Sequence, residues 1–274
     1  MISNQIIQEA LLRLKRSGER HIYLSELSKS HIKKINLMDK AVIEGESISE
    51  NKAVKSSELI GQIDAIQLTK DTKSENITVL KEVLSSLYPN DKLLFGTGSL
   101  NPKIVFLSAY PSAEEFQNNS LCVGKTNELM EKIFKAMGVD QEDVYFTSII
   151  KSKSLSYALI QKGINCSEYK GNRHFIDYLK KELSLITPAI IISLGELAFT
   201  LLSDRTLGAD EFNQTRGQLY EFSGYPVLST FNPSYLLLKD SIETKRLFWE
   251  DLLVVMETLK IEISEKQKNY FKKQ

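Results

Sequence analysis

The chain has 274 residues, enough for one large domain or for one domain with an extension. Its 35 basic and 35 acidic residues balance, so a nucleic-acid-binding role would require basic side chains gathered on one face. No run of about 18 apolar residues occurs and the N-terminus lacks a basic-then-apolar order, so we expect a cytoplasmic protein with no membrane partner.

The first 90 residues divide into two predicted parts. Residues 1–38 are expected to form an N-terminal helical extension, because apolar residues recur with the helical period at Ile6, Ile7, Leu11, Leu12 and Leu14. Its basic side is either a solvated face or a contact for phosphate or a partner. Residues 39–90 are expected to form a linker and a short helix at 77–87, since Glu, Ser, Lys and Asn dominate up to residue 76.

Residues 91–262 alternate predicted strands with predicted helices. Strands are expected at 104–107, 144–150, 189–194 and 226–230, and helices at 127–137, 174–185, 196–202 and 243–260. A further strand at 219–222 would form a hairpin around Ser223-Gly224. This order predicts a three-layer α/β/α fold with a central, mostly parallel four-stranded sheet. Residues 263–274 are expected to form a basic C-terminal tail.

Ligands in such sheets bind at the carboxyl ends of the strands. The loops after Leu107, Ile150, Leu194 and Thr230 are therefore the places where functional residues are expected.

The loop after Thr230 reads Phe231-Asn232-Pro233-Ser234-Tyr235-Leu236-Leu237. A strand, an Asn-Pro-Ser loop, a leucine and a helix in this order resemble the second active-site motif of the uracil-DNA glycosylase superfamily. The resemblance implies that Asn232 is catalytic and that Pro233, Ser234 and Leu236 contact DNA, with the leucine filling the gap left by a flipped base. Otherwise Asn-Pro-Ser is an ordinary turn, and Leu236 is a core residue at the start of a helix.

The similarity to family 4 of that superfamily extends from about residue 94 to 259. It is carried by short pieces in the family's order, which are Phe95-Gly96-Thr97-Gly98, Pro111 with Ala113-Glu114-Glu115, Val123-Gly124, Leu194-Gly195, Arg216-Gly217 and Phe248-Trp249-Glu250-Asp251-Leu252. The resemblance implies a uracil-DNA glycosylase-like fold for this part of the chain.

Several positions depart from the family pattern. Ala109 stands where family 4 has an acidic residue, and Tyr110 stands where other branches have Asp or Asn before the proline. The candidate catalytic residues here are therefore Tyr110 and Ser112. The candidate base-binding residues are Pro111, Cys122 in place of the family's stacking ring, and Ser148 in place of its amide. Glu114 or Glu115 could replace the missing acid, although solvated carboxylates are more common on such a loop.

Two basic stretches are candidate DNA contacts. Lys151 and Lys153 lie in the loop Lys151-Ser152-Lys153-Ser154 after the second strand, and Arg216 precedes the final hairpin. A solvated surface is the more common role of such a loop, and phosphate binding is the alternative.

Family 4 also holds a four-cysteine iron–sulfur cluster, and this chain lacks the cysteines that would bind it. No cysteine precedes Phe95, Ser152 occupies the third ligand position, and the fourth falls near Phe175. Cys166 matches neither position, and no histidine spacing suggests a metal. We therefore predict no cofactor and no metal, with the helical extension bracing the region in the cluster's place.

These residues predict a DNA-binding protein that lacks ordinary uracil excision and acts in DNA repair or replication. Its partners would be DNA and a replication or repair protein bound through the N-terminal extension. One alternative is an active DNA glycosylase that hydrolyses the N-glycosidic bond of a non-uracil or modified base. Another is a protein that binds a nucleobase or nucleotide without DNA. The sequence leaves the recognised base and the survival of catalysis open.

Overall fold

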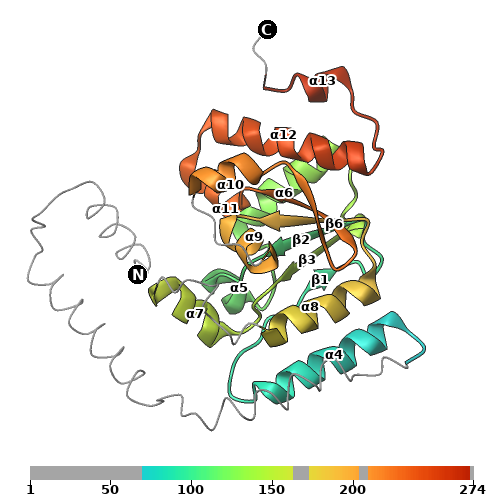
Figure 1. The fold of residues 1–274 in the computed structure, drawn as a ribbon, viewed down its shortest axis with the longest axis vertical. Helices are drawn as coiled ribbons and strands as arrows, with labels where there is room; N and C mark the ends of the chain where they lie inside the picture. The colour runs from blue at the N-terminus through green and yellow to red at the C-terminus, as the bar shows by residue number, and fades with distance from the viewer. Residues whose placement is uncertain (1–69, 163–172, 204–208, 272–274) are drawn as a thin grey trace, which may run out of the picture. The chain divides into compact units, whose positions relative to one another are not determined.

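The computed structural model describes residues 70–162, 173–203 and 209–271 (Figure 1). The predicted helical extension at 1–38, residues 39–69 of the predicted linker, and Cys166 lie outside these ranges. Within them, no helix is long and apolar enough to cross a membrane.

A six-stranded mixed sheet forms the centre of the fold, in the order β1-β3-β2-β4-β6-β5. Its four inner strands run parallel, and these are β3 (Val144–Ser148), β2 (Ile104–Ser108), β4 (Ile190–Leu194) and β6 (Tyr225–Thr230). Two antiparallel strands close the edges, β1 (Thr97–Gly98) beside β3 and β5 (Leu219–Phe222) beside β6.

The predicted α/β class is confirmed, but the predicted number of four strands is wrong. The four expected parallel strands are present, the strand expected at 219–222 is the edge strand β5, and β1 is added at the other edge. β1 has only two residues, and β5 alternates between exposed and half-buried positions. Neither edge strand therefore carries the continuous apolar run that buried parallel strands show.

Helices cover both faces of the sheet, which makes the three predicted layers. Along β2, Val105 and Leu107 pack into one core, whereas Ile104 and Phe106 pack into the other. The first core is completed by α4 (Lys73–Leu87), α7 (Lys153–Lys162), α8 (Arg173–Ile186) and α9 (Glu196–Ser203). The second is completed by α6 (Gly124–Met137), α11 (Pro233–Lys239) and α12 (Ile242–Thr258).

The long helices agree with the sequence prediction to within a few residues, except α4. That helix begins at Lys73 instead of residue 77, because Thr72 and Glu75 form a capping box in front of it. α6 ends at Gly138, whose φ of 72° is the left-handed conformation that favours glycine. Short elements were not predicted, namely α5 (Ala113–Asn118), the 3₁₀ turn η1 (Gln141–Asp143), α7, α10 (Ala209–Thr215) and α13 (Glu265–Lys268). The helix expected after the Asn-Pro-Ser loop is the short α11.

The C-terminal residues described by the structure contact the second core. The Trp249 indole nitrogen donates to the carbonyl of Gln267 at 2.8 Å, and the Gln267 side-chain amide donates to the carbonyl of Ala136 at 2.8 Å. Ile263 and Phe271 pack against the same apolar cluster. Residues 263–271 of the predicted tail therefore dock on α12 and α6.

Candidate functional site

The carboxyl ends of the four parallel strands are level with one another. Ser108 lies opposite both Ser148 and Leu194, and Leu194 lies opposite Thr230. The loops that follow β2, β3, β4 and β6 consequently share one edge of the sheet, which we call the carboxyl edge. This edge holds the predicted site residues.

The loop after β6 is held in one conformation by Asn232. The Asn232 side-chain oxygen accepts hydrogen bonds from the backbone nitrogen of Ser234 at 3.0 Å and from its hydroxyl at 2.8 Å, which caps α11. Pro233 is buried at the first turn of this helix. Because both bonds use the oxygen, the amide nitrogen of Asn232 is the donor available to a ligand.

The loops after β4 and β6 touch at Gly195 and Asn232. The Gly195 nitrogen donates to the Thr230 carbonyl at 2.7 Å, and a Cβ built at Gly195 would lie 3.6 Å from that of Asn232. Gly195 has a φ of 89°, which disfavours any other residue at this contact.

A buried hydrogen-bond network links the carboxyl end of β6 to α12. The Asp251 carboxylate accepts from the Thr230 hydroxyl at 2.6 Å and from the Arg216 guanidinium at 2.6 Å. The guanidinium also donates to the Leu247 carbonyl at 3.1 Å and lies over the Phe231 ring, 5.2 Å from its centroid. Burial raises the pKa of Asp251, and its two donors oppose that shift. Arg216, a predicted DNA contact, is thus engaged within the protein.

The leucines of α11 that are exposed to solvent are not the leucine that was predicted to contact DNA. Leu236 is 2% exposed and packs into the second core, so the interpretation as a core residue describes its position here. Tyr235, Leu237 and Leu238 are exposed at 38%, 40% and 55%. The helical period could have separated these positions, because Asn-Pro marks the helix start at Pro233.

The loop after β2, residues 109–112, contains no acidic residue, whereas Glu114 and Glu115 follow it on α5 and Glu114 is exposed. Ala109 and Pro111 are buried, and Tyr110 packs in part against the first core. Ser112 caps α5, where its hydroxyl accepts from the Glu115 nitrogen at 3.2 Å. The Glu115 carboxylate accepts in turn from the backbone nitrogens of Ser112 and Cys122, both at 2.7 Å. Glu115 therefore ties this loop to the next one.

The Cys122 thiol is buried and cannot supply the ring that the family places there. Its backbone has a φ of 53°, a left-handed conformation fixed by the bond to Glu115. Burial, with Glu115 and Glu131 nearby, raises the pKa of the thiol to about 12. The group is neutral at physiological pH and is a poor nucleophile or metal ligand.

The loop after β3 directs Ser148 and Lys151 inward. The buried Ser148 hydroxyl donates to the Ile150 carbonyl at 3.0 Å. This hydroxyl, which was predicted to bind a base, therefore already has a partner within the protein. The Lys151 ammonium is fully buried and donates to the Thr147 hydroxyl at 2.7 Å, the Ser148 carbonyl at 2.8 Å and Glu182 at 3.2 Å. The Lys151 ammonium is therefore not accessible for the predicted phosphate contact in this structure. Lys153, in contrast, is exposed.

The residues at the family's cluster positions do not fit an iron–sulfur cluster. Ser152 donates its hydroxyl to the Asp91 carboxylate, and Phe175 stacks on Tyr88 with ring centroids 5.1 Å apart. Iron–sulfur clusters need thiolate ligands, and neither position supplies one. Over the described ranges, no group of three or more His, Cys, Asp or Glu side chains is placed to hold a metal.

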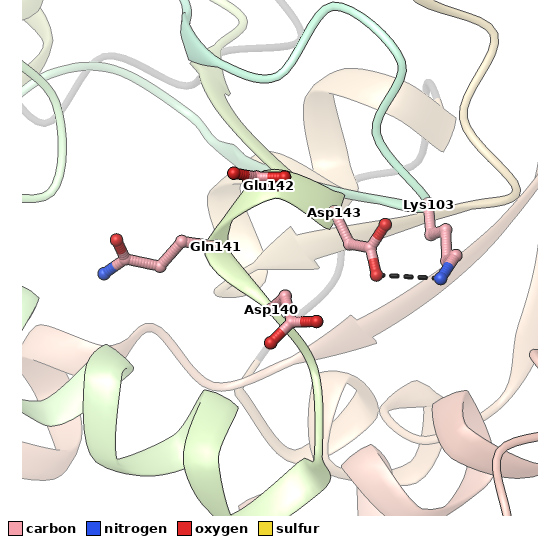
Figure 2. Close-up of a pocket in the computed structure, with 5 residues that line it drawn as sticks. All are labelled: Lys103, Asp140, Gln141, Glu142 and Asp143. Carbon is pink, nitrogen blue, oxygen red and sulfur yellow. Dashed lines mark hydrogen bonds and ion pairs between the residues drawn. The ribbon is translucent and has the colours of Figure 1, made fainter.

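A pocket lies away from the carboxyl edge, at the amino ends of β2 and β3 (Figure 2). It is lined by Lys103, Asp140, Gln141, Glu142 and Asp143, with Lys103 and Asp143 paired at 2.8 Å. Three carboxylates against one ammonium disfavour a phosphate there. The sequence pattern alone indicates no role for these residues.

Comparisons with known proteins agree with this geometry. The family model described as the uracil DNA glycosylase superfamily matches residues 95–253. A type-4 uracil-DNA glycosylase of Thermotoga maritima is 27% identical over 183 residues, which cover 66% of this chain and 84% of that protein. Another, from Archaeoglobus fulgidus, is 23% identical over 154 residues, covering 54% and 73%.

A further relative is much longer. A DNA polymerase of Bacillus phage SP01 is 30% identical over 149 residues, which cover 54% of this chain and 15% of the polymerase. The likeness is therefore to one part of that polymerase.

Proposed function

The chain belongs to the uracil-DNA glycosylase superfamily, and from this membership we propose that it is a DNA-binding protein that acts in DNA repair or replication without ordinary uracil excision. Its loop after β6 keeps the arrangement that would meet DNA. Its other loops lack the groups that would drive removal of uracil.

The polar groups of the carboxyl edge carry this proposal. Cleavage of an N-glycosidic bond builds positive charge on the sugar and negative charge on the leaving base, so it needs a carboxylate or held water and a hydrogen-bond donor. Here Ala109 and Tyr110 replace the acid, and Glu115 is bound to two backbone amides. The Ser148 hydroxyl is bound to Ile150. The Asn232 amide nitrogen remains as one donor, because the two hydrogen bonds that this side chain makes to Ser234 use its oxygen.

DNA would contact the loop through Asn232, Pro233 and Ser234. The exposed apolar side chains of Leu237 and Leu238 take the wedge role in place of Leu236, because a side chain must be accessible to enter the gap beside a flipped base. Tyr110 and Pro111 line the neighbouring loop.

The relation to the phage polymerase supports a replication role. A glycosylase-like domain joined to a polymerase would bring DNA binding to the same complex. For this chain, residues 1–38 are our candidate contact for a replication or repair protein, since their alternating apolar and basic faces suit a helix docked on a partner.

One observation favours an active glycosylase for another base as the second candidate. Asn232 is held rigidly by Ser234, and its free donor could stabilise charge on a base other than uracil. Such an enzyme would use DNA phosphates to help stabilise the sugar cation.

The test is excision and binding in the same samples. Labelled oligonucleotides would carry uracil, hypoxanthine, xanthine, mismatched thymine or a hydroxymethyl base, in single and double strands. We expect binding that weakens with salt and no release of uracil. The Asn232→Ala variant should bind less tightly, whereas the matched variant Asn269→Ala, in the docked C-terminal segment, should bind as wild type does.

Each other result has a defined meaning. Release of uracil by the wild-type protein would contradict the proposal. Release of another base that Asn232→Ala abolishes would establish the second candidate. Binding of free nucleobases or nucleotides without any affinity for DNA would identify a nucleotide-binding protein.

A further inference from the structure

Helix α7 lies at the carboxyl edge beside the loop after β3, at a distance from the Asn-Pro-Ser loop. The sheet order places β2 and β4 between β3 and β6, so the ends of those two outer strands are about 14 Å apart. That separation corresponds to a few nucleotides of a DNA strand. Helices α7 and α11 pack on opposite faces of the sheet, and Figure 1 shows both toward the left of the view.

The start of α7 is fixed by Asp91. One oxygen of its carboxylate accepts from the Ser154 nitrogen at 3.1 Å and from the Ser154 hydroxyl at 3.0 Å, and the other accepts from the Ser152 hydroxyl. The Lys153 nitrogen donates to the Lys92 carbonyl at 2.9 Å. The amides of Lys153, Ser154 and Leu155 are occupied by the Lys92 carbonyl, Asp91 and the Ser152 hydroxyl, respectively. A phosphate near the start of α7 would therefore be bound by a lysine side chain.

The two faces of α7 differ in character. Leu155 and Leu159 are buried in the first core and set the rotation of the helix. Lys153, Tyr157 and Ile160, which are spaced at i, i+4 and i+7, form one exposed stripe. Tyr157 is 39% exposed and Ile160 is 36% exposed.

The chemistry of this stripe suits an unpaired DNA strand. The Lys153 ammonium lies 5.9 Å from the centroid of the Tyr157 ring, so a cation and an exposed aromatic ring are neighbours. The helix sequence KSLSYALIQK contains two lysines and no acidic residue. Proteins that hold single strands combine such aromatic platforms with basic side chains along the backbone path.

We propose that α7 binds the unpaired strand beside the base held at the Asn232 loop. Tyr157 stacks on a base, Lys153 contacts a phosphate, and Ile160 extends the apolar surface. This inference rests on the proposed DNA binding and adds a second contact element to it. At the start of this helix the chain departs from the family 4 pattern, since Ser152 stands where that family has a cluster ligand.

Fluorescence anisotropy with a labelled single-stranded oligonucleotide and its duplex tests the inference. Tyr157→Ala should weaken single-strand binding about five- to hundredfold, the range of one lost base stack, and Tyr157→Phe should restore it. Lys153→Gln should lower the slope of log affinity against log salt by about 0.7 for the single strand. Tyr270→Ala, at an exposed tyrosine of the C-terminal segment, and Lys135→Gln, in the last turn of α6, are the matched controls.

The outcomes separate the two proposals. If the wild-type protein binds DNA and the α7 variants bind single strands equally well, α7 is not a contact and the proposed function stands. If the wild-type protein binds no DNA, both proposals are wrong. Equal losses in the control variants would also overturn the role of α7. Unchanged thermal unfolding of each variant, expected for exposed positions, shows that lost binding does not come from lost folding.

Discussion

A fully buried lysine holds the end of β3. The Lys151 ammonium has no exposure and shares Glu182 with the hydroxyls of Tyr145 and Thr147, which donate to that carboxylate at 2.9 Å each. Burial lowers the pKa of Lys151, and the neighbouring Glu182 opposes the shift. Buried pairs of this kind fix geometry, and removal of one member leaves the other charge uncompensated.

Lys151→Met should lower the free energy of unfolding by about 3 kcal/mol, because Glu182 then keeps only hydroxyl donors. Urea denaturation measures this change. The double variant Lys151→Met with Glu182→Gln should recover part of the loss, since no unpaired charge is left. The salt slope of DNA binding should stay at the wild-type value. A smaller salt slope with unchanged stability would instead mean that this ammonium faces DNA.

The predicted DNA contacts of Lys151 and Arg216 were not met because each side chain pairs with an acidic residue that is distant in the sequence. Lys151 and Lys153 are both lysines in one short loop, yet the first meets Glu182, 31 residues away in the sequence. Arg216 meets Asp251, 35 residues further along. Such pairings depend on the packed fold, so the sequence located the carboxyl edge but not the direction of each side chain.

At the scale of elements, the residues of the short helix α11 divide into buried and exposed positions. Asn232 caps the helix and Pro233 starts it, so the register of the following residues is fixed. Leu236 then faces α6 and α12 in the second core, while Leu237 and Leu238 face outward.

Leucine truncations on α11 should separate stability from binding. Leu236→Ala should lower the free energy of unfolding by about 2–5 kcal/mol, because it empties a buried site. Leu238→Ala should change stability by less than about 0.5 kcal/mol and should weaken DNA binding. Denaturation and anisotropy on the same preparations provide both values. Normal DNA binding by Leu238→Ala together with weak binding by a stable Leu236→Ala would return the wedge role to Leu236.

Length and apolar content decided which elements could be predicted. The inner strands and helices α6, α8 and α12 carry apolar runs or stripes that identify them. The two-residue strand β1 is too short to carry an apolar run. Helices such as α5 and α13 depend on local capping bonds of Ser112 and Ser264, and their apolar signal is weak.

At the scale of the molecule, three segments that are distant in sequence converge through side-chain contacts. Asp91 joins Ser152 and Ser154, and Tyr88 stacks on Phe175. Helix α4 packs beside α8 in the same core. Carboxylate–hydroxyl bonds and ring stacking hold the region where family 4 uses iron and sulfur.

Chelators should therefore leave the folded protein unchanged. We expect purified protein to lack the visible absorbance of an iron–sulfur cluster, and its thermal midpoint to be the same with and without a strong iron chelator. Asp91→Ala should lower that midpoint, because the hydroxyls of Ser152 and Ser154 and one amide lose their acceptor. Stoichiometric iron in the protein, with a lower midpoint after chelation, would contradict this expectation.

The acidic pocket at the amino ends of β2 and β3 has a consequence for how the molecule approaches DNA. Asp140, Glu142 and Asp143 gather negative charge at one end of the strands (Figure 2), whereas the exposed Lys153 follows β3 at the other end. The pocket therefore concentrates negative charge locally, although the whole chain has no net charge. In the proposed encounter with DNA, this end of the strands would be repelled by the phosphates, which would favour approach from the carboxyl edge before any contact forms.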